Sequence, residues 1–242
     1  MNEMKSHEVV WDKEKLGRFW DFFSSLGVAY EDEYFSNVWG ENILNYVTQT
    51  GPIEGRVVDF GCGPGHLMAK LIKRGIACEG LDFSANSIEE VKKRFANEPL
   101  FRGGHVVQSL PSDIPDASVD VLFFIETIEH VLPEQMESTL KEFSRILRKG
   151  GRIVVTTPHA ENLDRKKVCC PDCGAIFHRV QHIRSSTVDS LNALFGEYGF
   201  APVFSKAVTF YPRSFLNLLR KFRDERISKQ KPHHLIYIGE KR

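Results

Sequence analysis

The sequence has no apolar run long enough to cross a membrane, and the polar stretch from Met1 to Trp11 lacks the apolar core of a secretory signal. Net charge is also absent, because 32 basic residues balance 32 acidic ones. This balance gives no reason to expect nucleic acid or an anionic membrane as a partner. The five cysteines, three of them crowded together, are not the pattern of a secreted disulfide framework. We therefore expect a cytoplasmic protein that does not insert into membranes.

The 242 residues suit one large α/β domain with additions. From residue 51 onward, short apolar segments alternate with helical ones, which predicts a parallel sheet covered by helices on both faces. The expected strands are residues 57–58, 77–83, 105–108, 119–125, 152–157, 202–210 and 235–238, and the expected helices are residues 67–74, 87–96, 133–149 and 188–198.

We divide the chain into an N-terminal helical cap, residues 1–50, and a main domain, residues 51–242. The cap is rich in aromatic residues at helical spacing, which predicts two helices interrupted near Gly27. Residues 161–183 have no clear period and are expected to form a Cys/His-rich insertion or lid. The basic segment 213–231 is interpreted as an amphipathic surface helix. Candidates for the wall of a ligand pocket are Tyr30, Tyr34, Phe35 and Trp39, although core packing explains each of them equally well.

Residues 57–65 read VVDFGCGPG, a glycine-rich loop between an expected strand and an expected helix. Glycines at this position let backbone amides approach a ligand that lies across the carboxyl end of the strand. A dinucleotide-binding loop would place its third glycine at position 66, where His66 stands. Asp59 and Pro64 suit a cationic or zwitterionic ligand without phosphate, a description that S-adenosylmethionine meets. Asp82 closes the next strand about 20 residues later, where its carboxylate can bind ribose hydroxyls.

From about Gly55 to Gly199, the chain resembles a class I S-adenosylmethionine-dependent methyltransferase of the small-molecule type. Besides the glycine loop and Asp82, segments 108–120, 125–131 and 198–200 carry the resemblance. It implies a doubly wound, Rossmann-like α/β fold. The implied sheet has seven strands, mostly parallel with an antiparallel last strand, and helices on both faces.

The resemblance also implies which residues bind the cofactor. Asp59, Gly61, Gly63 and Gly65 would line the methionine part, Asp82 the ribose, and Gln108 and Ser109 the adenine. Cys62, Phe83, Leu110 and Glu126 complete the implied set. Gln108 departs from the family's pattern, which more often has an acidic residue at this position.

A sulfonium methyl group is already activated, so the enzyme mainly has to align the reacting atoms and exclude water. A hydroxyl acceptor would also need a base, near the carboxyl ends of the fourth and fifth strands. His130, His159 and Glu126 are the candidates by position. Each of them could equally serve to order or cap its loop.

The cysteine cluster predicts a structural zinc site. Cys170, Cys173, His178 and His182 have the spacing C-x2-C-x4-H-x3-H, which can present four ligands to a tetrahedral Zn²⁺. Alternatives stay open: free reduced cysteines, a redox dithiol, or Cys169 in place of one histidine. His182 could also be an acceptor-site residue, because the resembled family often carries a histidine just before its late helix.

These observations favour an S-adenosylmethionine-dependent methyltransferase with a small-molecule acceptor, and O-methylation of a sugar, a lipid-linked compound or another metabolite is the preferred reaction. RNA or protein could be the substrate instead. A non-catalytic cofactor-binding module and, more distantly, a dinucleotide oxidoreductase are further alternatives. The sequence does not indicate an oligomeric state.

Overall fold

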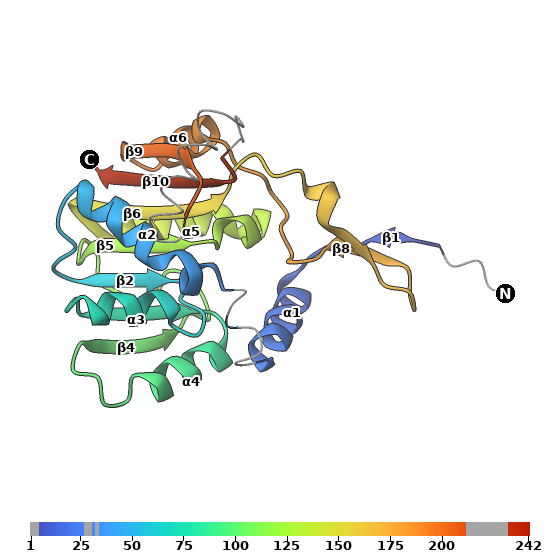
Figure 1. Ribbon diagram of the computed structural model, residues 1–242, viewed down its shortest axis with the longest axis horizontal. Coiled ribbons are helices and arrows are strands. Elements are labelled where there is room, and N and C mark those ends of the chain that lie inside the picture. The colour runs from blue at the N-terminus through green and yellow to red at the C-terminus, as the bar shows by residue number, and fades with distance from the viewer. Residues whose placement is uncertain (1–4, 27–30, 32–33, 212–231) are drawn as a thin grey trace.

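A computed structural model describes residues 5–26, 31, 34–211 and 232–242. Tyr30 and the basic segment 213–231 therefore lie outside the described residues. The central sheet consists of β2 (Val57–Phe60), β3 (Cys78–Asp82), β4 (Phe101–Val106), β5 (Val119–Ile125), β6 (Leu147–Pro158), β9 (Phe200–Val208) and β10 (His234–Lys241). Their order is β4-β3-β2-β5-β6-β10-β9. The last strand, β10, is antiparallel to both of its neighbours, and the other pairs are parallel, which confirms the predicted sheet (Figure 1).

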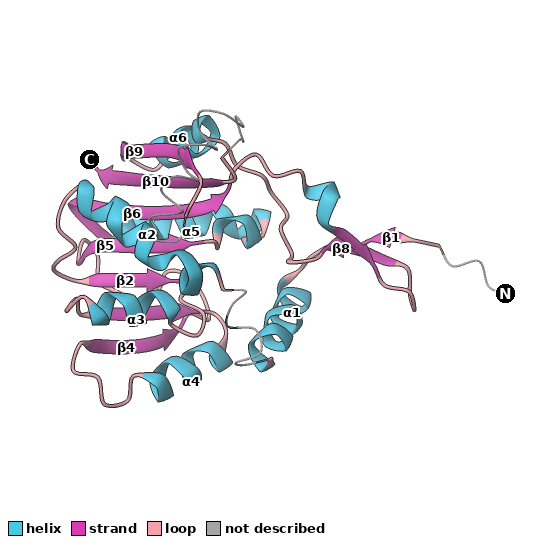
Figure 2. Cartoon of the chain, viewed as in Figure 1, coloured by secondary structure: helices cyan, strands magenta, loops and turns pink. Residues whose placement is uncertain are grey.

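Helices cover both faces of this sheet (Figure 2). The cluster on one face holds residues of α2 (Phe35–Gln49), α3 (His66–Lys73) and α4 (Ala85–Arg94), and the cluster on the other holds residues of α5 (Pro133–Ile146) and α6 (Val188–Glu197). Successive strand residues alternate between the two clusters, as Leu122 and Phe123 of β5 do. The doubly wound arrangement is therefore confirmed. Within the described part of the chain, no helix has both the length and the apolar content needed to cross a bilayer.

A second, three-stranded sheet projects from the main body (Figure 1). Its order is β1 (His7–Glu8), β8 (Ala175–His178) and β7 (Lys167–Cys169). The predicted insertion, residues 161–183, thus contains a β-hairpin, and the N-terminal chain adds a strand to it. This strand was not predicted, because two exposed residues carry no periodic signal.

Helix α1 (Lys13–Ser25) connects the projecting sheet to the main body. The Trp11 ring just before it packs against Phe177 of β8, with ring centroids 6.2 Å apart. Trp20 Nε1 donates a hydrogen bond of 3.3 Å to Gln181 Oε1. The first part of the predicted cap, β1 and α1, is therefore contiguous with the insertion, whereas α2 packs on the central sheet.

The buried Arg152 of β6 fixes the C-terminal end of α2. Its guanidinium donates to the carbonyl oxygens of Val47, Gly51 and Pro52, and to Thr50 Oγ1 at 2.9 Å. Gly51 and Pro52 follow the helix, so these bonds join the segment after α2 to β6, and the Val47 carbonyl also accepts from the Thr50 amide.

We expect Arg152→Gln to lower the free energy of unfolding by about 1–3 kcal/mol, because the bonds from this buried guanidinium to the segment after α2 are lost. Urea denaturation followed by circular dichroism measures the change. Arg102→Gln, at an exposed position of β4, is the matched control and should change stability by less than about 0.5 kcal/mol. Equal losses in the two variants would contradict this role for Arg152.

Candidate active site

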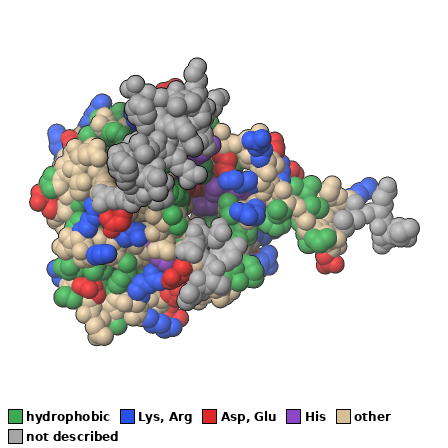
Figure 3. Space-filling model, viewed as in Figure 1, with side chains coloured by type: hydrophobic (Ala, Val, Ile, Leu, Met, Phe, Trp, Pro, Cys, Tyr) green, Lys and Arg blue, Asp and Glu red, His purple; other side chains and the backbone are tan. Residues whose placement is uncertain are grey.

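A cavity of about 340 Å³ lies at the carboxyl ends of the central strands, within the size range of small-molecule sites. Its floor includes the glycine loop, the residues after β3 and the residues after β5, and Phe19, Trp20 and Phe23 of α1 cover it. Tyr34 and Phe35 also line it, as predicted, whereas Trp39 stacks on Phe210 in the core. In Figure 3, histidine side chains are visible at the hollow between the main body and the projecting sheet.

The glycine loop is held against the end of β3. The amides of Gly61 and Cys62 both donate to the Leu81 carbonyl, at 2.7 and 3.1 Å. The Gly63 amide donates to Asp82 Oδ2 at 2.9 Å, and Asp82 Oδ1 accepts from the Ser84 amide at 2.8 Å. A single carboxylate therefore positions both the loop and the start of α4.

Two of the glycines are required for different reasons. Gly61 has φ +78°, and a Cβ there would lie 2.8 Å from the Thr127 side chain. Gly65 has φ +84°, and a Cβ there would lie 2.8 Å from the Phe95 ring. Gly61 thus allows the loop to approach the residues after β5, while Gly65 permits close packing of the loop against α4.

The predicted cofactor-binding residues divide into two groups. Those on the cavity wall are Gly61, Cys62, Gly63, Asp82, Phe83 and Glu126. The others, which are not among the residues lining the cavity, are Asp59, Gly65, Gln108, Ser109 and Leu110. Gln108 and Ser109 are exposed beyond β4, and Asp59 is buried within β2. Direct adenine contact by residues 108–110 stays a prediction.

Two buried carboxylates lie beneath the loop. Burial, reinforced by the charge of Asp82, raises the pKa of Asp59 to about 8. Burial also raises the pKa of Asp82, against the opposing effect of the amides that donate to it. A ligand that carries positive charge would stabilise the ionised forms of both acids and so lower these pKa values.

An acid whose pKa is higher in the folded than in the unfolded state contributes stability while protonated, and loses it as the pH rises through the folded value. The free energy of unfolding of the cofactor-free protein should therefore fall from about pH 6.5 to about pH 8.5, by about 1–2 kcal/mol through Asp59. Urea denaturation of Asp59→Asn should show a correspondingly smaller fall. Asp113→Asn, at an exposed position, should retain the parent slope. An unchanged slope in Asp59→Asn would show that Asp59 is ionised across this range.

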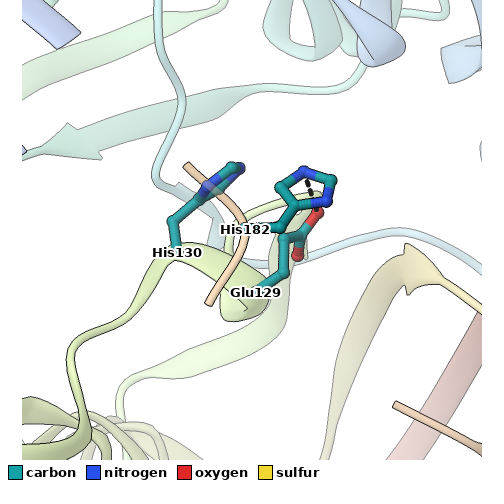
Figure 4. Close-up of side chains that lie close together, drawn as sticks. All are labelled: Glu129, His130 and His182. Carbon is teal, nitrogen blue, oxygen red and sulfur yellow. Dashed lines mark ion pairs between the residues drawn. The ribbon is translucent and has the colours of Figure 1, made fainter. Parts of the chain in front are cut away.

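Carboxylate and imidazole groups gather where β5 and β6 end. Figure 4 shows Glu129 and His130, from the short 3-10 helix η2 (Ile128–His130), beside His182 from the end of the insertion. Glu129 is 1% exposed, and its Oε2 accepts from Thr157 Oγ1 at 3.0 Å. His182 Nε2 lies 3.9 Å from Glu129 Oε1, and His182 Nδ1 lies 2.5 Å from Glu161 Oε2.

Two of the three predicted base candidates lie on the cavity wall, namely Glu126 and His130. Burial raises the pKa of Glu126 to about 8, and its Oε1 has no hydrogen-bond partner. Burial, with the charge of His182 and opposed by bonds to Gln181, lowers the pKa of His130 to about 3, so its imidazole is neutral. His159 is not among the lining residues, and its ring Nδ1 lies 3.3 Å from the Pro232 carbonyl oxygen.

The predicted zinc ligands do not come together. Among the described residues, the groups that could hold a metal are Glu129, His130 and His182, and Glu161, His178 and His182, and neither contains a cysteine. Cys170 and Cys173 lie at the turn of the β7–β8 hairpin, where Cys170 accepts from the Gly174 amide. β8 then carries the chain about 10 Å from this turn before it reaches His178.

Glu129 and Glu161 are site residues that sequence reasoning missed. Glu129 stands in the segment 125–131 that carried the family resemblance, so a signal existed. Glu161 begins a segment without periodicity, and only the fold brings it to His182.

A Rossmann-like sheet with a glycine loop after β2 and an acid at the end of β3 defines a class of nucleoside-cofactor enzymes. The sequence pattern of a family described as a methyltransferase domain matches residues 32–204. This match covers more than half of the chain, which therefore belongs to that family and is an S-adenosylmethionine-dependent methyltransferase.

Individual proteins agree with this assignment. An uncharacterized methyltransferase of Anoxybacillus flavithermus is 26% identical over 205 residues, covering 78% of this chain and 93% of that protein. Phosphoethanolamine N-methyltransferase 2 of Haemonchus contortus, in complex with phosphomonomethylethanolamine and S-adenosylhomocysteine, has a TM-score of 0.65 at 16% identity, covering 96% of this chain and 61% of that one. Geranyl diphosphate C-methyltransferase of Streptomyces coelicolor, in complex with Mg²⁺, geranyl diphosphate and S-adenosylhomocysteine, has a TM-score of 0.60 at 17% identity, covering 95% and 97%. At these identities the structural similarity establishes the fold.

Proposed function

We propose that this enzyme transfers a methyl group from S-adenosylmethionine to a hydroxyl oxygen of a small-molecule acceptor, such as a sugar, a lipid-linked compound or another metabolite, in the cytoplasm. One observation carries the proposal. The glycine loop, Asp82 and the group formed by Glu129, His130 and His182 all line a single cavity of about 340 Å³. Aromatic residues of α1 cover this cavity, which suits a small acceptor and the exclusion of water.

The strand order supports a cavity with a cofactor side and an acceptor side. β2 lies between β3 and β5, so the glycine loop stands between Asp82 on one side and Glu126 on the other. With its ribose at Asp82 and its methionine part along the loop, the cofactor would direct its methyl group toward the residues after β5. The acceptor would then occupy the side of the cavity lined by Glu126, Glu129 and His182.

The reaction places two demands on this side of the cavity. The acceptor oxygen forms the O–CH₃ bond as the S–CH₃ bond breaks, and the electron pair of that bond stays on sulfur, giving S-adenosylhomocysteine. The hydroxyl proton must leave to a base. The Oε1 atom of Glu126 is buried at the wall without a hydrogen-bond partner, so we assign this carboxylate as the first candidate to accept the proton. Because its pKa is raised to about 8, it acts as a base in its ionised form.

S-Adenosylhomocysteine should bind with a Kd in the micromolar range in calorimetric titrations, and Asp82→Ala should weaken binding by about tenfold or more. The variant loses both the predicted ribose contact and the anchor of the Gly63 amide. NAD should give no heat of binding.

The exposed Asp113→Ala is the control and should bind like the parent protein. Equal affinity of the parent and Asp82→Ala, or binding of NAD instead, would sink the proposed cofactor site.

With methyl-labelled S-adenosylmethionine and a cell extract as the source of acceptors, label should enter the small-molecule fraction. Each labelled product should resist alkaline conditions that cleave methyl esters, as an ether does. Label found only in RNA or protein would contradict the small-molecule acceptor and show that the acceptor is a macromolecule. Cofactor binding without any transfer would favour a non-catalytic module.

A further inference from the structure

Three metal-binding side chains from two distant segments converge on the cavity wall. Glu129 and His130 follow β5, and His182 ends the insertion. One potential ligand atom of each lies within 4.8 Å of those of the other two (Figure 4). The side chains of His182 and Glu129 are 9% and 1% exposed.

The outer hydrogen bonds leave the inner nitrogen of each histidine available. His130 Nδ1 lies 3.1 Å from Gln181 Oε1, which also accepts from Trp20 Nε1, so this amide oxygen is an acceptor and His130 Nδ1 carries the proton. His182 Nδ1 lies 2.5 Å from Glu161 Oε2 and likewise donates. In both rings Nε2 is then the nitrogen that remains for a metal ion. Metal-binding histidines are typically oriented in this way, by a carboxylate or carbonyl on the other nitrogen.

Glu129 points an unsatisfied oxygen at one of these nitrogens. Its Oε1 is buried and has no hydrogen-bond partner, although Oε2 is bonded to Thr157. The distance of 3.9 Å from Oε1 to His182 Nε2 is too long for a hydrogen bond. Two ligands that each lie about 2.0–2.2 Å from one ion can be up to about 4.2 Å apart, so the observed distance suits a pair that shares a cation.

Among the residues that the structure describes, His182 is the one basic side chain within ion-pair distance of Glu129. Glu126 and Glu161 lie close enough to influence Glu129 electrostatically. Lys166 is paired with Glu161 at 2.6 Å, and Arg184 donates to the Val131 carbonyl. Neither of these cations forms an ion pair with Glu129 in the described structure.

We propose that Glu129, His130 and His182 bind one divalent first-row transition metal ion at the acceptor end of the cavity, with Glu161 and Gln181 as positioning residues. Two imidazoles and one carboxylate suit ions of the Mn²⁺ to Zn²⁺ series. Three protein ligands leave coordination positions open toward the cavity. This site uses His182 but neither cysteine of the hairpin turn.

The role of the ion rests on the proposed function, whereas its binding does not. An acceptor hydroxyl that entered an open position would become more acidic, and its oxygen would be fixed for in-line attack on the methyl group. An acceptor with two neighbouring oxygens, such as a vicinal diol or a catechol, could occupy two open positions. This chemistry narrows the substrate class to compounds that can chelate a metal.

Binding can be tested with Co²⁺ on chelator-treated, full-length protein, followed by visible absorption and by calorimetry. We expect about one equivalent to bind, with His130, His182 and Glu129 as ligands. Glu129→Gln and His182→Gln should each weaken Co²⁺ binding by about 100-fold or more, and Glu161→Gln by about 10–100-fold. His159→Gln, which lies off the cavity wall, and Cys170→Ser/Cys173→Ser should bind Co²⁺ like the parent protein.

Thermal unfolding and circular dichroism of the metal-free variants establish that each one folds, and His130→Gln replaces any that does not. S-Adenosylhomocysteine binding by metal-free parent protein separates the two proposals, because it tests the cofactor site alone. Two results would overturn the metal site. One is that the parent protein folds and binds the cofactor but takes up no Co²⁺. His182 would then join Glu129 and Glu161 through hydrogen bonds and not through a metal ion. The other is Co²⁺ binding that survives Glu129→Gln and His182→Gln but is lost in the cysteine variant.

Discussion

The hydrogen bond from the Gly63 amide to the buried carboxylate of Asp82 is the contact on which the site depends. It joins the loop after β2 to the end of β3, and the second carboxylate oxygen accepts from the amide of Ser84, the N-cap of α4. Together with Asp59 of β2, it also places two buried acids with raised pKa values at the point where parallel strands end. Ionising buried acids is unfavourable unless a partner compensates the charge, so a ligand with cationic groups would stabilise their ionised forms.

The side chain of Gln181 links α1 to the candidate active site. The side chain of Gln181, fully buried, accepts from Trp20 Nε1 and bonds His130 Nδ1, while its own amide donates to the His130 carbonyl. Its backbone has φ +57°, an uncommon conformation for a residue other than glycine. One side chain thus connects α1, the insertion and the segment after β5. Gln181 therefore links the position of His130 to that of α1.

The fold was predictable because its signals are local. The alternation of apolar strands and amphipathic helices predicted a parallel sheet with helices on both faces, and the strand at residues 119–125 was located without error. Boundaries failed where two signals compete: Gly150 and Gly151 suggested a helix that extends to residue 149, yet α5 ends at Ile146 and β6 begins at Leu147. β4 likewise begins at Phe101, ahead of the predicted residue 105.

The candidate site was predictable only in part. Gly61, Gly63 and Asp82 stand in a motif whose spacing specifies the local structure, and they lie on the cavity wall. The zinc prediction treated ligand spacing as sufficient, but an extended β8 separates the cysteines from the histidines. Glu161 reaches His182 through tertiary structure, a relation that spacing in the sequence does not encode.

A crystal structure of the protein with S-adenosylhomocysteine tests the central claim most directly. The account predicts the ribose hydroxyls within hydrogen-bond distance of Asp82, the homocysteine along the loop from Gly61 to Gly63, and the sulfur directed toward Glu126 and His130. A ligand outside this cavity, or one bound in it with the ribose turned away from Asp82, would contradict the account.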